Sequence, residues 1–317
     1  MDLHLLPKFR DGLSFLYVEH CKVDQDKKGI AIHDARGKVP VPCASLALLM
    51  LGPGTTVTHA AIRSLAENGC LVAWCGEGAV RFYAQGLGET RKARNLLKQA
   101  RLVSEPGLRL RVVRRLYQMR FPEPLPESLS LREIRGKEGV RVRQAYAKAS
   151  RETGVEWKGR FYNRDRWHST DPVNRALSVA NSCLYGVCHA GIISAGYSPA
   201  LGFIHTGKML SFVYDVADLY KTELSIPIAF RAAAESTPDL EGRVRRLCRD
   251  AFTETSLLAR IPADIERALA WEGLGDGPEP GEDVDADAAA PGGLWDPDGG
   301  EVPGGTSYGE DGEGGGT

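Results

Sequence analysis

Two carboxylates three residues apart, Asp215 and Asp218, lie in an otherwise apolar stretch of this sequence. On a helix this spacing places both on one face, where two negative charges are costly unless a positive group neutralises them. His205, on the glycine-flanked loop just before, can fold back toward that face. Carboxylate oxygens with one imidazole suit Mg²⁺ or Mn²⁺. A structural role also stays open, in which His205 is a packed polar residue and either carboxylate pairs with Lys221.

The sequence lacks the motifs of several other chemistries. It has no Gly-x-x-x-x-Gly-Lys-Ser/Thr phosphate loop, no Gly-x-Ser-x-Gly nucleophile turn and no His-Glu-x-x-His zinc motif. Gly76-Glu77-Gly78 has neither the third glycine nor the following helix of a dinucleotide loop, so we interpret it as a hairpin turn. We therefore expect any phosphoryl chemistry to be that of a nuclease or a transesterase, with no nucleotide cofactor.

The net charge of -1 hides two blocks of opposite sign. Residues 275–317 hold 12 acidic residues, no Lys or Arg and 14 of the 36 glycines, which is typical of a disordered, solvated tail. The rest of the chain carries all 40 Lys+Arg and 29 Asp+Glu, a balance of +11. Between Arg91 and Arg166 there are 21 basic and eight acidic residues. This excess indicates a polyanionic partner such as DNA, because solvated helix faces usually mix both signs.

Cysteine usage and hydropathy indicate a cytoplasmic protein. The seven cysteines form no Cys-x-x-Cys pair, and most have apolar neighbours, so we expect reduced core thiols. Apolar runs such as residues 46–51 are far too short to span a bilayer. The first residues, Met1-Asp2-Leu3-His4, lack the basic-then-apolar layout of a signal peptide.

The hydrophobic pattern predicts an α+β, multi-domain chain. Its first part alternates as strands do, and the strands are expected at residues 13–18, 29–33, 38–42, 46–51, 71–74 and 80–84, with one helix at 59–68 capped by Thr58. The spacing then becomes helical, in a run that reaches Met119 and in helices at about 133–146, 171–196, 211–221, 226–236, 241–260 and 262–272. The predicted domains are a small β-rich one at 1–86, a larger all-α one at 87–274 and the tail at 275–317.

Several segments together resemble the CRISPR-associated integrase, the metal-dependent DNA endonuclease of the spacer-acquisition complex. The resemblance is closest to the type I-E branch, and it extends in the expected order from about Leu13 to Arg260. Its signature is His205-Thr206-Gly207-Lys208 followed by 211–218, and the supporting segments are 51–55, 135–143 and 182–187. The resemblance implies an N-terminal β-sandwich-like domain followed by a C-terminal α-helical domain.

The same resemblance implies a site and a reaction. The metal ligands of the family fall on Glu138, His205 and Asp218, with Asp215 as an accessory carboxylate, and the cofactor is Mg²⁺ or Mn²⁺. The implied reaction is transesterification, in which the 3′-hydroxyl of a DNA fragment attacks a phosphodiester of the CRISPR repeat during prokaryotic antiviral defence. The family forms a homodimer bridged by a small ferredoxin-like partner protein.

Residues similar to the DNA contacts of the family include arginines for phosphates and aromatics for stacking on DNA ends. They are Arg63, Arg81, Tyr162, Trp167, Tyr185, Lys208 and Tyr214. Two positions depart from the family pattern, since His20 stands where relatives carry a wedge tyrosine and Thr56 where a relative has an arginine. Two other functions fit the same residues: a DNA-binding scaffold with structural carboxylates, and a nuclease of branched repair intermediates.

Overall fold

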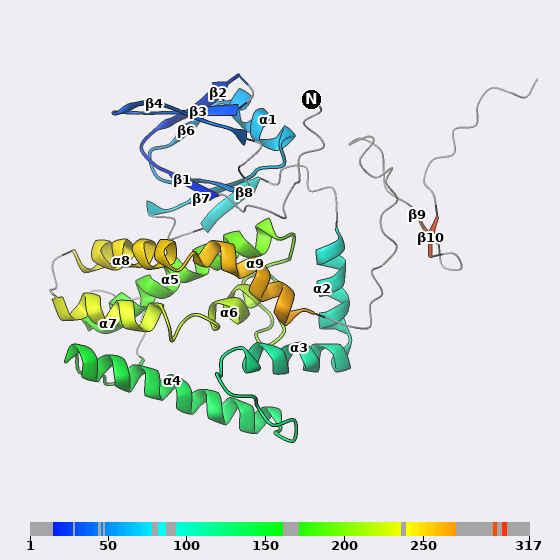
Figure 1. The fold of residues 1–317 in the computed structure, drawn as a ribbon, viewed down its shortest axis with the longest axis vertical. Helices are drawn as coiled ribbons and strands as arrows, with labels where there is room; N and C mark the ends of the chain where they lie inside the picture. Colours follow the sequence, from blue (N-terminus) through cyan, green and yellow to red (C-terminus); the bar gives the residue numbers. More distant parts are fainter. Residues whose placement is uncertain are drawn as a thin grey trace, which may run out of the picture. The chain divides into compact units, whose positions relative to one another are not determined.

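The computed structural model describes residues 15–27, 29–43, 46, 48–77, 82–86, 93–160, 171–235, 239–270, 294–296 and 300–302 (Figure 1). Residues 1–270 form one compact unit and residues 271–317 a second. In the second unit, strands β9 (Leu294–Asp296) and β10 (Gly300–Val302) pair antiparallel. The disordered tail and the boundary between residues 86 and 87 stay predictions.

Two four-stranded sheets form the N-terminal part of the first unit. In one sheet the order is β1-β5-β7-β8, with three parallel strands and an antiparallel edge: β1 (Phe15–Val18), β5 (Leu48–Leu51), β7 (Leu71–Cys75) and β8 (Phe82–Gly86). The other has the order β4-β3-β2-β6: β4 (Gly37–Val41), β3 (Gly29–Asp34), β2 (Lys22–Asp26) and β6 (Thr56–Val57). The predicted hairpin of β3 and β4 is confirmed. Strand β2 was not predicted, because its polar residues surround a single buried valine, Val23.

Strand β5 is buried on both faces, because successive side chains of a strand point to opposite sides. Leu49 and Leu51 join the core between the two sheets. Leu48 and Met50 join a second core that includes Ala190 of the long helix α5 (Pro172–Ser194). The apolar run of this strand therefore serves two cores at once. The sandwich-like N-terminal part thereby packs directly on the helical part.

Helix α1 (His59–Glu67) covers the sandwich core and begins and ends as the sequence predicts. The Thr58 side chain accepts a hydrogen bond from the backbone N–H of Ala61, which satisfies one of the free donors of the first turn. Gly69, just after the helix, adopts a positive φ of 68°, a conformation that favours glycine. Leu65 is fully buried between the sheets.

The C-terminal part is helical, so the predicted fold class is confirmed. Its further helices are α2 (Arg94–Ser104), α3 (Pro106–Gln118), α4 (Leu131–Thr153), α6 (Ser211–Ala217), α7 (Ser225–Glu235), α8 (Leu240–Glu254) and α9 (Leu257–Ala268). Helix α5 packs against α6, α7, α8 and α9. It is long and apolar enough to cross a membrane, but 67% of its apolar window is buried inside the fold, as a core helix requires. All seven cysteines are buried.

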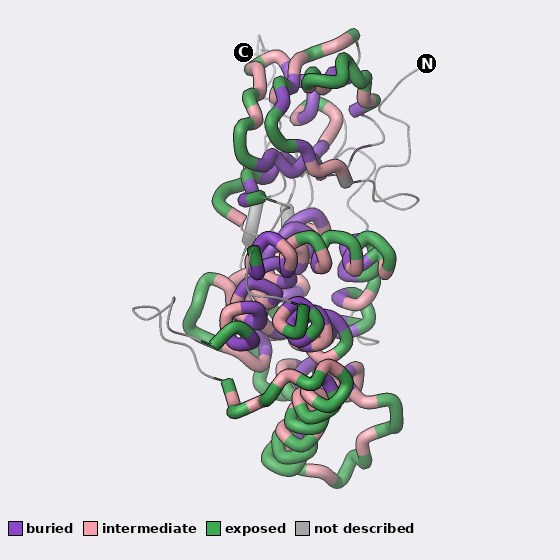
Figure 2. Tube along the Cα trace, turned by 90° about the vertical axis from the view of Figure 1, so that its left-hand side faces the viewer, coloured by how far each residue is buried: buried purple, intermediate pink, exposed green. Residues whose placement is uncertain are grey.

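Several predicted helix boundaries are wrong, including the end of the helix predicted at 211–221, which stops at Ala217. The helical run before Met119 divides at Glu105, which is extended because the following proline, Pro106, disfavours a helical conformation there. The predicted helix 241–260 ends instead at Glu254, because Ser256 turns the chain with a φ of 47°. Pro262 lies inside α9 and does not begin it. Buried residues concentrate in β5, β7 and the central helices, whereas α4 is largely exposed (Figure 2).

Candidate functional site

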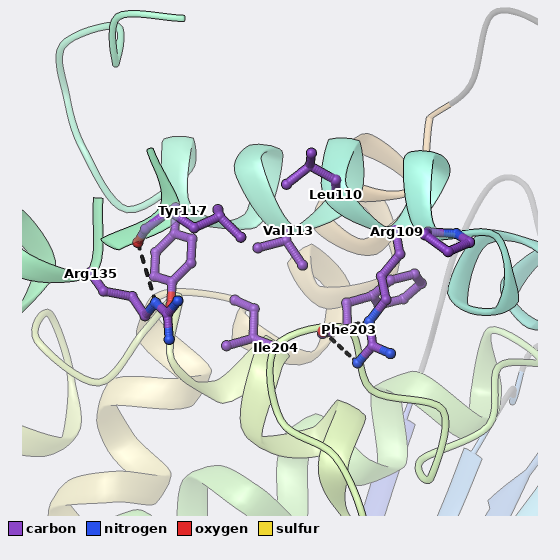
Figure 3. Close-up of a pocket in the computed structure, with 9 residues that line it drawn as sticks. Arg109, Leu110, Val113, Tyr117, Arg135, Phe203 and Ile204 are labelled. Carbon is purple, nitrogen blue, oxygen red and sulfur yellow. Dashed lines mark hydrogen bonds between the residues drawn. The ribbon is translucent and has the colours of Figure 1, made fainter. Parts of the chain in front are cut away.

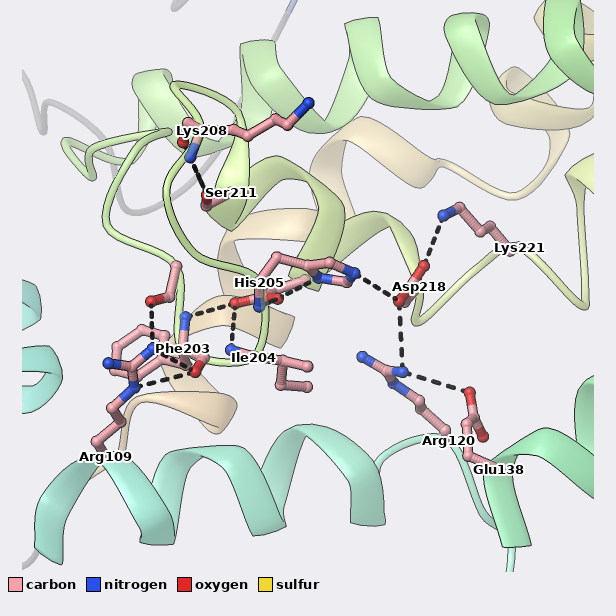
Figure 4. A network of polar contacts seen from close by, with 12 residues as sticks. Arg109, Arg120, Glu138, Phe203, Ile204, His205, Lys208, Ser211, Asp218 and Lys221 are labelled. Atoms are coloured by element: carbon pink, nitrogen blue, oxygen red, sulfur yellow. Dashed lines mark hydrogen bonds and ion pairs between the residues drawn. The ribbon is translucent and has the colours of Figure 1, made fainter. Parts of the chain in front are cut away.

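Two helices, α2 and α3, hold the loop that carries His205. Gln99 of α2 is fully buried, donates to the carbonyl oxygens of Ser198 and Leu201, and accepts from the backbone N–H of Ser198 at 2.8 Å. Arg109 of α3 donates to the carbonyl oxygen of Phe203 through Nε at 3.0 Å and Nη2 at 2.8 Å (Figure 4). These contacts fix the backbone just before the imidazole.

Asp215 of α6 closes this loop on itself. Its side chain has no exposed surface, and Oδ2 accepts hydrogen bonds from the backbone N–H groups of Phe203 at 2.6 Å and Ile204 at 3.0 Å. Oδ1 accepts from the backbone N–H of His205 at 2.9 Å and lies 2.7 Å from the His205 Nδ1 atom. The buried carboxylate is thus satisfied by donors from three consecutive residues.

The Asp215 contact determines the proton arrangement of His205. Because an ionised carboxylate can only accept, Nδ1 carries the proton and Nε2 of the neutral ring keeps its lone pair. Nε2 faces Asp218, with 4.0 Å to its Oδ2 atom. The structure therefore brings together His205 and the two carboxylates, as their spacing predicts. Asp215 and Asp218 approach opposite nitrogens of one imidazole.

Asp218 follows α6 directly and has a second partner, Lys221. The Lys221 Nζ atom lies 2.6 Å from Asp218 Oδ1 and 5.0 Å from the centre of the Tyr185 ring. Burial disfavours the charged ammonium, but Asp218 and Tyr185 outweigh that effect and raise the Lys221 pKa above its ordinary value of 10.5. This pair is the one that the structural interpretation of the sequence anticipates.

Glu138 of α4 shares a cationic partner with Asp218. Its carboxylate receives two hydrogen bonds from Arg141, at 2.7 and 2.9 Å. The Nη1 atom of Arg120 lies 3.3 Å from Glu138 Oε1 and 3.5 Å from Asp218 Oδ2 (Figure 4). Two carboxylates from helices far apart in the sequence thus share one guanidinium nitrogen.

Arg120 and Arg141 are site residues that the sequence analysis missed. Both belong to the basic stretch between residues 91 and 166, which holds 21 basic residues. The sequence alone does not show which of these lie at the site. The spacing of Arg141 three residues after Glu138 is a usable signal, since such pairs meet on a helix. No local pattern marks Arg120, which pairs with residues 18 and 98 positions away.

One predicted DNA-contact aromatic lies beside the imidazole, and a second lies next to the first. The Tyr214 ring meets the His205 ring edge-on at a centroid distance of 5.8 Å, and it meets the Tyr185 ring in the same manner at 5.1 Å. Lys208 is exposed, and its backbone N–H donates to the Ser211 hydroxyl at 3.0 Å. Tyr214 and Tyr185 therefore border the candidate site, through His205 and Lys221 respectively, while the Lys208 side chain lies at the protein surface.

Arg63 is the other predicted DNA contact that the structure describes, and it is not part of this cluster. Arg63 lies exposed on α1, a helix that packs on the sheets, and faces Glu67 at 3.7 Å. His20, which departs from the family pattern at the wedge position, lies exposed in the turn after β1 with a φ of 49°. Arg81, Tyr162 and Trp167 fall outside the described residues.

A pocket of about 360 Å³ lies on the α3 side of the His205 loop (Figure 3). Its wall is apolar with two arginines at the rim, and the lining residues are Pro106, Arg109, Leu110, Val113, Tyr117, Leu131, Arg135, Phe203 and Ile204. Tyr117 separates it from the guanidinium of Arg120, which lies 4.9 Å from the ring centre.

The donor set suits a hard divalent cation, since it offers two carboxylates and an imidazole whose second nitrogen is already hydrogen-bonded. Among the residues that the structure describes, no three His, Cys, Asp or Glu side chains are assembled closely enough to hold a metal ion as they stand. The space between Glu138 and Asp218 instead contains the Arg120 Nη1 atom. The residues fit a divalent metal chemically once the Arg120 side chain moves out of this space.

Known proteins provide a family. A model of the CRISPR associated protein Cas1 family matches residues 120–237. The CRISPR-associated endonuclease Cas1 2 of Thermus thermophilus is 58% identical over 310 residues, which cover 98% of this chain and 94% of the relative. The CRISPR-associated endonuclease Cas1 of Geobacter sulfurreducens is 46% identical over 278 residues, which cover 87% and 91% of the two chains.

A solved structure agrees with these relatives. The crystal structure of a TtCas1–DNA complex is 59% identical, covers 85% of this chain and 100% of that chain, and superposes with a TM-score of 0.76. Identities of this size over most of both chains establish that this chain is an endonuclease of the CRISPR-associated protein Cas1 family.

Proposed function

We propose that this endonuclease inserts DNA fragments into a CRISPR array and that Glu138, His205 and Asp218 hold the Mg²⁺ or Mn²⁺ ion that the reaction uses. The observation that carries the proposal is that Glu138 and Asp218 share one cationic group, the Arg120 guanidinium, while the Nε2 atom of His205 lies 4.0 Å from the Asp218 carboxylate. Sequence segments in the expected order favour the type I-E branch.

The reaction is a transesterification. A new P–O bond forms between the 3′-oxygen of the incoming strand and the repeat phosphorus, and the bond to the repeat's own 3′-oxygen breaks. The attacking hydroxyl loses its proton, and the departing 3′-oxygen takes one up to become a hydroxyl. When bound, a divalent ion aligns the attacking oxygen and neutralises charge on the phosphorus. With water in place of the DNA hydroxyl, the same residues perform endonuclease cleavage.

The chain's own residues position these groups. Asp215 keeps the proton on Nδ1 of His205, so Nε2 stays available as a ligand. Tyr185 and Tyr214 offer ring faces on which a base at a DNA end can stack. Helix α4 exposes several cations that can contact phosphates: Arg132, Arg135, Lys137, Arg143, Lys148 and Arg151. The TtCas1–DNA complex supports DNA as the partner.

In the proposed complex the chain acts as a homodimer with a small ferredoxin-like partner protein. The test combines both proteins with a duplex that has 3′-OH ends and a supercoiled plasmid that bears the repeat, with Mg²⁺ or Mn²⁺. Asp218→Asn and Glu138→Gln should each lower strand joining at least about 100-fold. Asp250→Asn is the control, because its exposed carboxylate pairs only with the neighbouring Arg249 in the described structure.

Other outcomes distinguish the alternatives. Strand joining that persists in Asp218→Asn removes Asp218 from the metal site. No joining by the wild-type protein, with nicking of branched DNA intact, favours the repair nuclease. DNA binding without cleavage or joining favours the scaffold, in which Arg120, Arg141 and Lys221 neutralise structural carboxylates.

A further inference from the structure

Arg120 is the most unusual polar side chain of the site. It follows α3 directly, and its side chain is only 3% exposed. Its Nη1 atom contacts Glu138 at 3.3 Å and Asp218 at 3.5 Å, which is long for charge-assisted hydrogen bonds. The same two carboxylates have much shorter contacts with Arg141, at 2.7 Å, and with Lys221, at 2.6 Å. Arg120 is therefore held between the carboxylates without strong hydrogen bonds to either.

The remaining nitrogens of Arg120 are poorly satisfied. Nε and Nη2 are buried and have no hydrogen-bond partner among the described residues. The face of the guanidinium lies on the Tyr117 ring at 4.9 Å, which offers some compensation. A buried donor without an acceptor is unfavourable, so two on one side chain oppose this placement. A structural arginine would be expected to use its planar fork in paired hydrogen bonds, as Arg141 does.

Electrostatics explains why the guanidinium is there nonetheless. Glu138 is 14% exposed and Asp218 is 19% exposed, so their mutual repulsion is poorly screened by water. A positive charge between them stabilises the two carboxylates at their observed positions. A divalent cation would supply more charge at the same place, and it would free Arg120 from a placement in which two of its donors are unpaired.

We propose that Arg120 is an internal counter-ion for the metal-free protein, which occupies the place between Glu138 and Asp218 and gives up both contacts when a divalent cation binds. The proposal rests on the proposed function, because it needs the metal to bind between these carboxylates. Its consequence is that Arg120 competes with the metal. The side chain keeps the two carboxylates together before binding and lowers their affinity for the ion.

The test measures Mn²⁺ binding to the full chain by isothermal titration calorimetry. Arg120→Met should bind Mn²⁺ about 10-fold more tightly than the wild type, while Glu138→Gln should bind it at least about 10-fold more weakly. In EDTA, Arg120→Met should melt at a lower temperature than the wild type, and Mn²⁺ should raise its melting temperature by more. Arg175→Met is the matched control, since Arg175 also has a buried unpartnered Nε atom and a carboxylate partner, Glu241.

The outcomes separate the inference from the proposed function. If Glu138→Gln weakens binding but Arg120→Met leaves it unchanged or weakens it, Arg120 is a fixed support and the inference is overturned alone. If Glu138→Gln leaves Mn²⁺ binding unchanged, the proposed metal site and the inference both fall. Should Arg120→Met not fold, the guanidinium N–H signals of Arg120 in the wild type decide by NMR. They should shift on addition of Mg²⁺ and stay unchanged in Glu138→Gln, and no shift in the wild type overturns the inference.

Discussion

The Nδ1 atom of His205 lies 2.7 Å from the Oδ1 atom of Asp215, and the same carboxylate oxygen accepts the backbone N–H of His205. One buried carboxylate therefore fixes both the backbone and the ring of the histidine. This arrangement explains how an imidazole that is 42% exposed keeps one orientation toward Asp218. Asp215 therefore shapes the loop, and this role differs from that of a carboxylate that faces the metal.

Replacing Asp215 by asparagine should destabilise the fold. An amide has one accepting oxygen, and its NH₂ group would face N–H donors that now meet a carboxylate oxygen. We expect the free energy of unfolding to fall by about 2–4 kcal/mol, measured by urea denaturation. Asp250→Asn, whose side chain is 63% exposed, should change it by less than about 0.5 kcal/mol. A loss no larger in Asp215→Asn than in this control would contradict the role given to the carboxylate.

Gly202, at the start of the same loop, should not tolerate a side chain. A Cβ atom there would overlap the carbonyl oxygen of His205 and the Cβ atom of Ser211. Gly202→Ala is therefore expected to lower the free energy of unfolding by about 2 kcal/mol. The matched change Gly136→Ala should raise it by about 0.5–1 kcal/mol, because a Cβ atom at this position in α4 meets no described atom within 4 Å. Equal effects of the two substitutions would show that the loop can adjust.

The elements of the fold were predictable where local signals and burial agree. Thr58 caps α1, and Asp171 caps α5 by accepting from the backbone N–H of Asn174 at 3.0 Å. Strand β2 was missed because its sequence is polar, although it pairs with β3 in a local hairpin. The break at Ser256 was missed because a positive φ at serine has no sequence signature.

The candidate site, too, was predictable only in part. The proximity of His205 to Asp215 and Asp218 was predictable, because the two carboxylates are three residues apart and the loop of His205 directly precedes them. The approach of Glu138 depended on family resemblance, since the residue comes from a helix 80 positions earlier. Arg120 was not predictable, because its partners are set by how α3, α4 and α6 pack and not by any neighbour in the chain.

The acidic tail should weaken non-specific DNA binding by the body of the protein. Residues 276–317 carry all 12 acidic groups of the tail and no cation, while residues 1–274 have a balance of +11. Deleting 276–317 should tighten binding to random duplex DNA and leave the salt dependence similar or steeper, as measured by fluorescence anisotropy. A full-length variant with the acidic residues replaced by Asn and Gln should behave like the deletion. Weaker binding after deletion would instead make the tail a DNA contact.

His189 should make the fold sensitive to mild acid. This α5 residue stacks on Phe82 of β8 with ring centroids 3.9 Å apart, and burial lowers its pKa from 6.5 to about 4. Between these values the unfolded chain binds a proton that the folded protein does not. The titration of His189 therefore does not affect the free energy of unfolding above pH 6.5. As the pH falls toward 4, it lowers this free energy progressively, by up to about 3 kcal/mol.

The measurement compares urea denaturation of the wild type and His189→Gln from pH 7.5 to 4. Because other titrating groups are common to both proteins, the difference in their free energies of unfolding isolates His189. We expect the variant to be the less stable protein at pH 7.5, since it loses the stacking on Phe82, and to lose less stability than the wild type on acidification. Parallel curves over the whole range would show that His189 takes up its proton in the folded protein near its ordinary pKa.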